Sequence, residues 1–196
     1  HRPTRQHRAR LTTDQRTVAA EIEAELASAI PMARLLQGDV GCGKTLVALL
    51  SALLVIAGGE QAAFLAPTEL LARQHAENAA RLLEPLGVRI AFLSGSVTGD
   101  PRGLLLQALR AGEVDLLFGT HALFSEEVTF KELGLVVVDE QHRFGVLQRQ
   151  ALLRKGTSPD LLLMTAPPIP RTLALTAFGD LDVSSIRTMP AGRRPV

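Results

Sequence analysis

Residues 35–45 read LLQGDVGCGKT, in which an apolar stretch runs directly into the pattern GxxxxGK[ST]. Such a loop folds tightly at its glycines and points several backbone N–H groups at phosphate oxygens. Residues 33–36 before it are strand-like, and residues 46–56 after it are rich in Ala, Leu and Val, as expected of a helix. The sequence therefore predicts a strand, a phosphate-binding loop and a helix, with a nucleoside triphosphate as the ligand.

Individual residues of this loop suit separate tasks. Gly38, Gly41 and Gly43 allow the tight backbone path. Lys44 is expected to reach the β and γ phosphates, and Thr45 is expected to ligate Mg²⁺. A glycine-rich turn with an incidental lysine is the alternative, and the flanking strand and helix argue against it.

A second feature follows the apolar run 135–138, where two adjacent carboxylates end an expected strand. Asp139 can hold Mg²⁺, often through water, and Glu140 can orient and deprotonate an attacking water. The alternative is that Asp139 only caps a following helix. Together with the phosphate-binding loop, the acidic pair predicts metal-assisted hydrolysis of the triphosphate.

Apolar runs recur along the chain and alternate with helix-like or turn-rich stretches. They lie at residues 62–66, 88–93, 114–118, 133–138 and 161–164. The predicted fold class is α/β, with a mostly parallel sheet, helices on both faces, and ligands beyond the carboxyl ends of the strands. A first helix is expected from Thr12 or Thr13, with apolar positions through Ile30 and a stop at Pro31.

The composition indicates one packed domain in water. The chain has 196 residues, a formal net charge of +1 and a single cysteine, Cys42, so an internal disulfide is excluded. No apolar run approaches a membrane span, no Cys/His cluster has structural-zinc spacing, and a reducing compartment is expected. Because the chain begins at His1, we expect a piece of a longer protein. Residues 1–10 are expected to be a basic, solvated leader, with an arm that touches phosphates as the alternative.

Five blocks of sequence share one further pattern. They are GDVGCGKT at 38–45, APTELLARQH at 66–75, GTHAL at 119–123, DEQHRFG at 139–145 and PIPRTLALT at 168–176. Together they resemble superfamily 2 helicases, and most closely the RecG family, from about residue 11 to residue 196. The resemblance implies the first of two RecA-like motor domains, a P-loop NTPase fold, in an ATP-driven enzyme that remodels stalled forks and Holliday junctions in repair and recombination. The related transcription-repair coupling factors usually carry a second Glu at the position of Gln141 and are the alternative family.

The resemblance also implies roles for individual residues. Those it assigns to ATP and Mg²⁺ chemistry are Lys44, Asp139, Glu140 and His142, and it adds Asp39 to the nucleotide-binding residues of the loop. Those it places along a track for the DNA backbone are Pro67, Thr68, Glu69, Gly119, Thr120 and His121. Thr68 and Thr120 are equally good helix N-caps, which is the simpler alternative. Thr165 and Arg171 are assigned to coupling between the nucleotide and the DNA.

Residues 11–15 resemble the Q motif, in which the amide of Gln15 would donate to and accept from the adenine edge. The alternative is an exposed Gln15 in a first helical turn. The chain departs from the family at two positions. Ala9 stands where an aromatic residue often stacks on the base, and Pro167 replaces a threonine in the coupling motif. The proline removes both a hydroxyl and a backbone N–H.

The resemblance implies partners outside this chain. They are branched double-stranded DNA, a second RecA-like domain beyond a linker at residues 190–196, and an N-terminal wedge domain. The motor domain itself would span residues 11–189. Since the second domain would donate arginine fingers, we expect the isolated chain to hydrolyse ATP barely, if at all. A bacterial, cytoplasmic, nucleoid-associated protein is implied. Two other classes of function are a nucleotide switch without translocation and a P-loop kinase.

Overall fold

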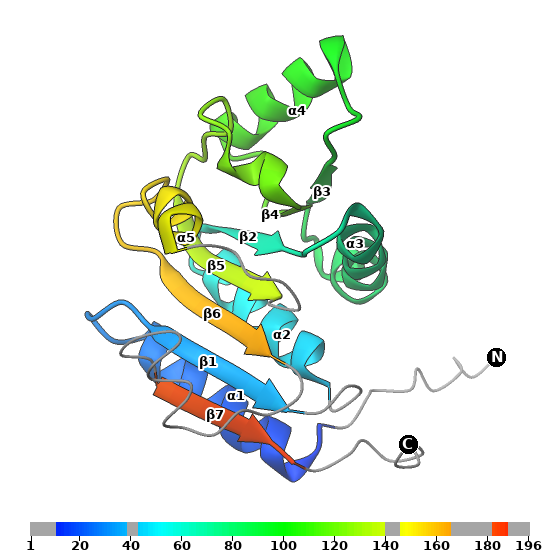
Figure 1. Ribbon diagram of the computed structural model, residues 1–196. Helices are drawn as coiled ribbons and strands as arrows, with labels where there is room; N and C mark the ends of the chain where they lie inside the picture. Colours follow the sequence, from blue (N-terminus) through cyan, green and yellow to red (C-terminus); the bar gives the residue numbers. More distant parts are fainter. Residues whose placement is uncertain (1–10, 39–42, 140–145, 166–181, 188–196) are drawn as a thin grey trace, which may run out of the picture.

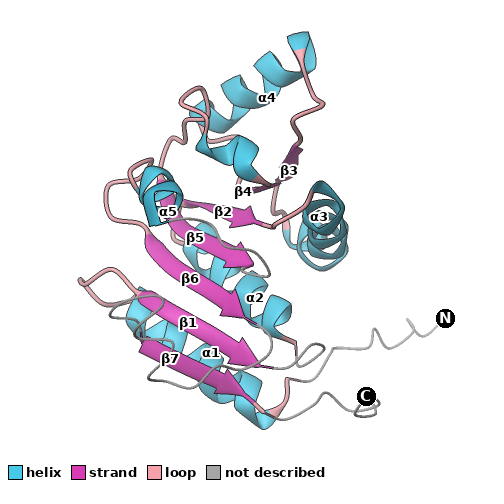
Figure 2. Cartoon of the chain, in the orientation of Figure 1, coloured by secondary structure: helices cyan, strands magenta, loops and turns pink. Residues whose placement is uncertain are grey.

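The structure, a computed structural model, describes residues 11–38, 43–139, 146–165 and 182–187. Those residues form an α/β fold in which a twisted sheet is sandwiched between helices (Figures 1 and 2). The fold class predicted from the sequence is confirmed. A seven-stranded sheet forms the middle layer, and every strand pairing in it is parallel.

The strands run in the spatial order β3-β4-β2-β5-β6-β1-β7. Their bounds are β1 Ala33–Gly38, β2 Gln61–Leu65, β3 Ile90–Leu93, β4 Leu116–Gly119, β5 Leu133–Asp139, β6 Asp160–Thr165 and β7 Asp182–Ile186. From β1 the chain crosses to β2 on one side, whereas β7 lies on the other side of β1. Ligands of open parallel sheets bind beyond the carboxyl ends of the strands at such a reversal.

Helices cover both faces of this sheet, as predicted. One apolar core packs beneath α1 (Thr13–Leu26), α2 (Lys44–Ala57) and α3 (Glu69–Leu83). The other packs beneath α4 (Gly99–Ala111), the 3-10 helix η2 (His121–Phe124) and α5 (Val146–Leu153). A second 3-10 helix, η1, spans Glu84–Leu86. Consecutive residues of a strand point to opposite faces, so Val137 of β5 joins the first core and Val138 the second.

The first helix is shorter than predicted. It ends at Leu26, with Ala27 as its C-cap, and does not reach Pro31. Beyond it the Ser28 hydroxyl accepts a hydrogen bond from the Ile30 backbone N–H at 3.2 Å, an alternative to a helical bond that serine often supplies. Ile30 is 76% exposed, so its apolar character was misleading.

Strand β7 was not predicted, because its sequence DVSSI contains no continuous apolar run. Its buried Ser184 is nevertheless satisfied. The Ser184 hydroxyl accepts from Arg34 Nη1 of β1 at 2.6 Å and donates to Glu21 Oε2 of α1 at 2.7 Å. Ser185 accepts from the Gln37 amide at 2.8 Å. These long-range partners let a serine-rich segment form a strand, and local sequence does not reveal them.

Candidate functional site

The phosphate-binding loop and Asp139 lie at the same edge of the sheet. The register places Asp139 beside Met164 of β6, and Met164 beside Leu36 of β1. Neighbouring strands lie about 4.8 Å apart, so the backbone of Asp139 is about 10 Å from that of Leu36, two strands away. Leu36 is two residues before the end of β1 at Gly38. The start of the loop and the acidic strand end are therefore close enough to share one ligand.

Both elements also address the same face of the sheet. Alternation along β5 puts Asp139 on the face of Val137, which is the face covered by α1, α2 and α3. Lys44 is the first residue of α2, and its ammonium donates to the carbonyl oxygen of Gly38 at 2.7 Å. A lysine amine thus sits directly over the carboxyl end of β1.

Gly43 must be a glycine for two separate reasons. It is the N-cap of α2 with φ +87°, a left-handed conformation that side chains rarely adopt. A Cβ atom there would also lie 1.9 Å from Nε2 of Gln15. No side chain of the described residues caps α2, and its first turn holds no acidic residue, so the positive end of this helix is suited to an anion from outside the protein.

Gln15 is buried, with 2% exposure, so the alternative of an exposed helical glutamine is wrong. Its amide Oε1 accepts from the Thr12 backbone N–H at 2.8 Å, while the Thr12 hydroxyl accepts from the Gln15 N–H at 3.2 Å. This capping box begins α1. The amide Nε2 donates to the Gly43 carbonyl at 3.4 Å, so Gln15 joins α1 to the phosphate-binding loop. That contact was missed, although the spacing Thr12-x-x-Gln15 could have revealed the cap.

Asp139 is largely buried and contacts a residue that the sequence did not nominate. Its Oδ2 lies 3.0 Å from Nε2 of His75, which belongs to α3. The two residues are 64 positions apart, and no local pattern in the sequence links them. Only the packing of α3 on the sheet, with His75 against Phe64 of β2, brings them together.

Thr165 ends β6, between the ends of β1 and β5. It pairs in register with Gln37 and is 7% exposed. Within the described residues its hydroxyl has no hydrogen-bond partner. A buried hydroxyl without a partner is costly, and one at the edge of a candidate ligand site is suited to a ligand or a bound water.

Pro67, Thr68 and Glu69 form the junction between β2 and α3. The Thr68 hydroxyl accepts from the Leu71 N–H at 3.2 Å, so Thr68 does act as an N-cap. Glu69 holds the loop after β3, since its Oε1 accepts from the Ser94 hydroxyl at 2.9 Å and from the Gly95 N–H at 3.0 Å. Thr68 and Glu69 are exposed and accessible to a large ligand.

The second block of candidate DNA contacts is less open. Gly119 ends β4 and is buried, and Thr120 is only 3% exposed. Thr120 occupies the N-cap position of η2, a 3-10 helix of four residues, but its side chain makes no cap bond within the described residues. His121 is exposed. In this block, His121 offers the accessible side chain.

Several candidate residues lie outside the described part of the chain. Among the site residues they are Asp39, Gly41, Glu140, His142 and Arg171; the same holds for Ala9, Cys42, Gln141 and Pro167.

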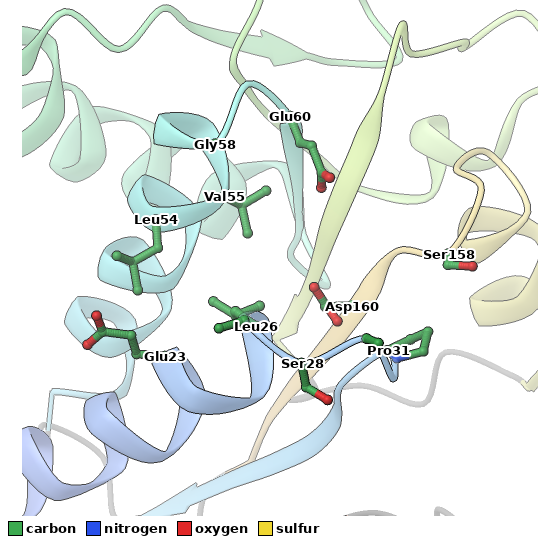
Figure 3. A pocket seen from close by; sticks show the side chains of 12 residues that line it. Glu23, Leu26, Ser28, Pro31, Leu54, Val55, Gly58, Glu60, Ser158 and Asp160 are labelled. Atoms are coloured by element: carbon green, nitrogen blue, oxygen red, sulfur yellow. The ribbon is translucent and has the colours of Figure 1, made fainter.

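The opposite edge of the sheet has a different character. A pocket of about 400 Å³ lies there between the ends of α1 and α2 and the start of β6 (Figure 3). Burial raises the pKa of Glu60, and repulsion from Glu132 and Asp160 raises it further. Burial also raises the pKa of Asp160. The hydrogen bond that Asp160 accepts from the Met32 N–H lowers this pKa, but by less than burial raises it. Acidic groups and the negative ends of two helices disfavour an anion at this edge.

The residues at the carboxyl edge fit a magnesium–triphosphate. The Asp139 carboxylate and the Thr45 hydroxyl are oxygen donors of the kind that Mg²⁺ takes. The Lys44 ammonium and the N-terminus of α2 are suited to phosphates. The described residues contain no cluster of three or more His, Cys, Asp or Glu side chains able to hold a metal by themselves. None of the described helices is long and apolar enough to span a membrane.

Comparisons with known proteins agree with this geometry. The family model described as DEAD/DEAH box helicase matches residues 12–177. The chain is 59% identical over 193 residues to the ATP-dependent DNA helicase RecG of Treponema pallidum (strain Nichols), covering 95% of this chain and 28% of that protein. It is 54% identical over 186 residues to the protein of the same name from Bacillus subtilis (strain 168), and the match covers 95% of this chain and 27% of that protein.

A solved structure of RecG bound to a three-way DNA junction matches 95% of this chain and 25% of that chain, with a TM-score of 0.83 and 44% identity. The chain thus spans about a quarter of the length of these relatives.

Proposed function

Since this chain belongs to the DEAD/DEAH box helicase family, we propose that it is the first RecA-like motor domain of an ATP-dependent DNA helicase of the RecG type. The observation that carries the proposal is the meeting of two elements at one sheet edge: Lys44 over Gly38 at the end of β1, and Asp139 at the end of β5. The RecG name of the relatives favours this type over the coupling-factor alternative.

The residues of the site would divide the work as follows. Lys44, the loop with Gly38, Asp39, Gly41 and Gly43, and the N-terminus of α2 would hold the phosphates. Thr45 and Asp139 would hold Mg²⁺, which neutralises charge on the transferred phosphoryl group. Glu140 would orient and deprotonate the attacking water, and His142, two residues further along the chain, would take part in the ATP and Mg²⁺ chemistry.

Gln15 supports adenine selection less directly than the sequence implied. Its amide already accepts from Thr12 and donates to Gly43, so its role would be to place the loop at least as much as to touch the base. The Thr165 hydroxyl, which has no hydrogen-bond partner among the described residues, favours a part in sensing the nucleotide, with Arg171 as its proposed companion.

The DNA side of the domain would be formed by the two strand-to-helix junctions of β2 and β4. The exposed Thr68, Glu69 and His121 would face the backbone, with Pro67, Gly119 and Thr120 shaping the track. The proposed substrate is branched DNA, which is the ligand named for the solved RecG relative. Action on such DNA implies a nucleoid-associated protein of the bacterial cytoplasm.

The remaining parts of the motor would lie outside this chain. We assign residues 11–189 to the motor domain, residues 1–10 to a basic leader and residues 190–196 to the linker toward a second RecA-like domain. That domain would supply arginine fingers, and a wedge domain would recognise the junction. Because a finger supplied from outside contributes about 10³ to 10⁵ in rate, the isolated chain is expected to be nearly inactive.

The test is the ATPase rate of the full-length protein with no DNA, with linear duplex and with a three- or four-way junction. All three are measured at one stated salt concentration, because phosphate contacts weaken steeply with salt. We expect the junction to stimulate hydrolysis most. Equal rates with linear duplex and junction would contradict the RecG type, and brisk DNA-stimulated turnover by the 196-residue chain alone would contradict the need for a second domain.

A further inference from the structure

One hydrogen bond connects helix α3 with the acidic end of β5. His75 Nε2 lies 3.0 Å from Asp139 Oδ2, and the side chains are 16% and 12% exposed. A carboxylate oxygen only accepts, so the His75 ring N–H donates. In a site so shielded from water, a charge-assisted bond of this length fixes the orientation of the carboxylate.

The His75 ring is itself held in place by packing. It lies against Phe64 of β2 with 4.8 Å between ring centroids and a tilt of 39°. Phe64 in turn stacks on Phe118 of β4 at 5.1 Å. Both phenylalanines are fully buried, so the imidazole has little freedom to turn away from Asp139. The donor is therefore already in place before any ligand binds.

Helix α3 connects this donor to the proposed DNA track. The helix starts at Glu69, just after the Thr68 cap, and His75 follows six residues later, about 9 Å along the axis. Strand β2, which leads into α3, pairs with β5 as far as Leu65 and Val138. One end of α3 thus lies at the track, and its second turn contacts the proposed metal ligand.

We propose that His75 is a positioning residue for Asp139 and that it links the DNA track to the metal site. Because the imidazole occupies Oδ2, Oδ1 is the carboxylate oxygen of Asp139 that would hold the metal. A shift of α3 on DNA binding would move the donor and so change how well Asp139 holds Mg²⁺. The inference rests on the proposed function, since it gives Asp139 its metal. It also supplies a second coupling route in a chain whose coupling motif has Pro167 in place of a threonine.

Two substitutions in the full-length protein separate this role from simple packing. His75→Phe keeps a ring against Phe64 and removes the N–H donor. His75→Gln removes the ring and keeps an N–H the same number of bonds from Cα as Nε2. A positioning role makes the Phe variant worse than the Gln variant, whereas a packing role makes the Gln variant worse. Gln74→Ala, an exposed neighbour on α3, is the matched control.

The direct readout is the dissociation constant of Mn²⁺, measured by electron paramagnetic resonance in the presence of a non-hydrolysable ATP analogue. Loss of a hydrogen bond that orients a metal ligand typically weakens metal binding 10- to 100-fold. We expect His75→Phe to raise the Mn²⁺ dissociation constant by about that factor. His75→Gln should stay near wild type, and Gln74→Ala should be unchanged.

The second readout is the change in junction affinity when the analogue and Mn²⁺ are added. This change should shrink in His75→Phe and persist in His75→Gln. If His75→Phe does not fold, His75→Asn replaces it, because its amide is one bond too short to reach Asp139. The inference is overturned if the Phe or Asn variant binds Mn²⁺ like wild type, or if the Gln variant is the weaker. Wild-type protein that binds no Mn²⁺–nucleotide would instead overturn the proposed function.

Discussion

The carboxyl and amino edges of the sheet differ in whether their polar groups have hydrogen-bond partners within the described residues. At the carboxyl edge, Lys44 begins α2, whereas Asp139 and Thr165 end strands β5 and β6. Among the described residues, the Thr165 hydroxyl lacks a partner and no side chain caps α2. At the amino edge, a buried polar side chain forms its hydrogen bonds with backbone groups of the domain itself. The buried Gln61 donates to the carbonyls of Leu109 and Val114 and accepts from the Glu132 N–H.

The difference teaches where function and stability reside in this domain. Parallel strands put all their carboxyl ends on one edge, so the starts of α2 and α3 gather there with their positive dipole ends. The helix ends and the acids Glu60 and Asp160 gather on the other edge. We expect substitutions at the carboxyl edge to impair chemistry, and those at the amino edge to impair folding.

The largest effect is expected for Lys44→Ala in the full-length protein. Removing a charge aimed at the transferred phosphoryl group should lower kcat of ATP hydrolysis by at least about 10³-fold, about 4 kcal/mol in the activation barrier. Junction binding without nucleotide should persist, because Lys44 lies at the nucleotide site. Steady-state ATPase and a binding titration measure both. An unaltered kcat would remove Lys44 from its role.

Gln61→Ala should produce the reverse pattern at the amino edge. The substitution leaves the Leu109 and Val114 carbonyls and the Glu132 N–H without their partner, in a buried place. We expect the free energy of unfolding to fall by about 2–4 kcal/mol, while nucleotide binding by the folded protein is retained. Urea denaturation of the 196-residue chain followed by circular dichroism gives the first quantity. A loss of nucleotide affinity without a loss of stability would erase the distinction between the edges.

The smallest effect concerns pH. Because burial and the nearby acids raise the pKa of Glu60 above its ordinary 4.5, the fold favours the protonated form. The stability that protonation provides is complete below pH 4.5 and is lost as the pH rises through the raised pKa. Glu60→Gln should therefore match wild type in stability at low pH and exceed it at neutral pH, by about 0.5 kcal/mol at most, because the Glu60 carboxyl is only partly buried and solvent screens its charge.

Asp115, also at the amino edge, is a control because its pKa is shifted in the opposite direction from that of Glu60. Burial would raise the pKa of Asp115, but hydrogen bonds from the Arg89 side chain and N–H outweigh it and lower the pKa. That pair stabilises the fold above the ordinary pKa of 3.8, and its contribution is lost as the pH falls. Asp115→Asn should thus be less stable than wild type at neutral pH and still at pH 4, and should approach wild type only as the pH falls through the lowered pKa. Denaturation curves at pH 7.5, at pH 4 and at a pH well below 3.8 test both variants, and equal pH dependence of the two would contradict the assigned shifts.

Local sequence was sufficient for much of the fold. The near-continuous apolar runs predicted six of the seven strands, and the pattern ending in Lys44 and Thr45 predicted a helix after β1. Local sequence was not sufficient where a segment depends on hydrogen-bond partners that are distant in the chain. Strand β7 depends on Arg34 and Gln37 of β1 for its serines, and α1 ends before Ile30 because serine competes for backbone bonds.

The amino-acid sequence was enough to identify a phosphate-binding loop, an acidic strand end and an α/β sheet, because each depends on residue types at short, regular spacing. Only the tertiary structure decided which distant groups meet. It buried Gln15 against Gly43 and set His75 against Asp139. The order of strands across a sheet, and therefore the neighbours of each strand end, is set by long-range packing that no local spacing records.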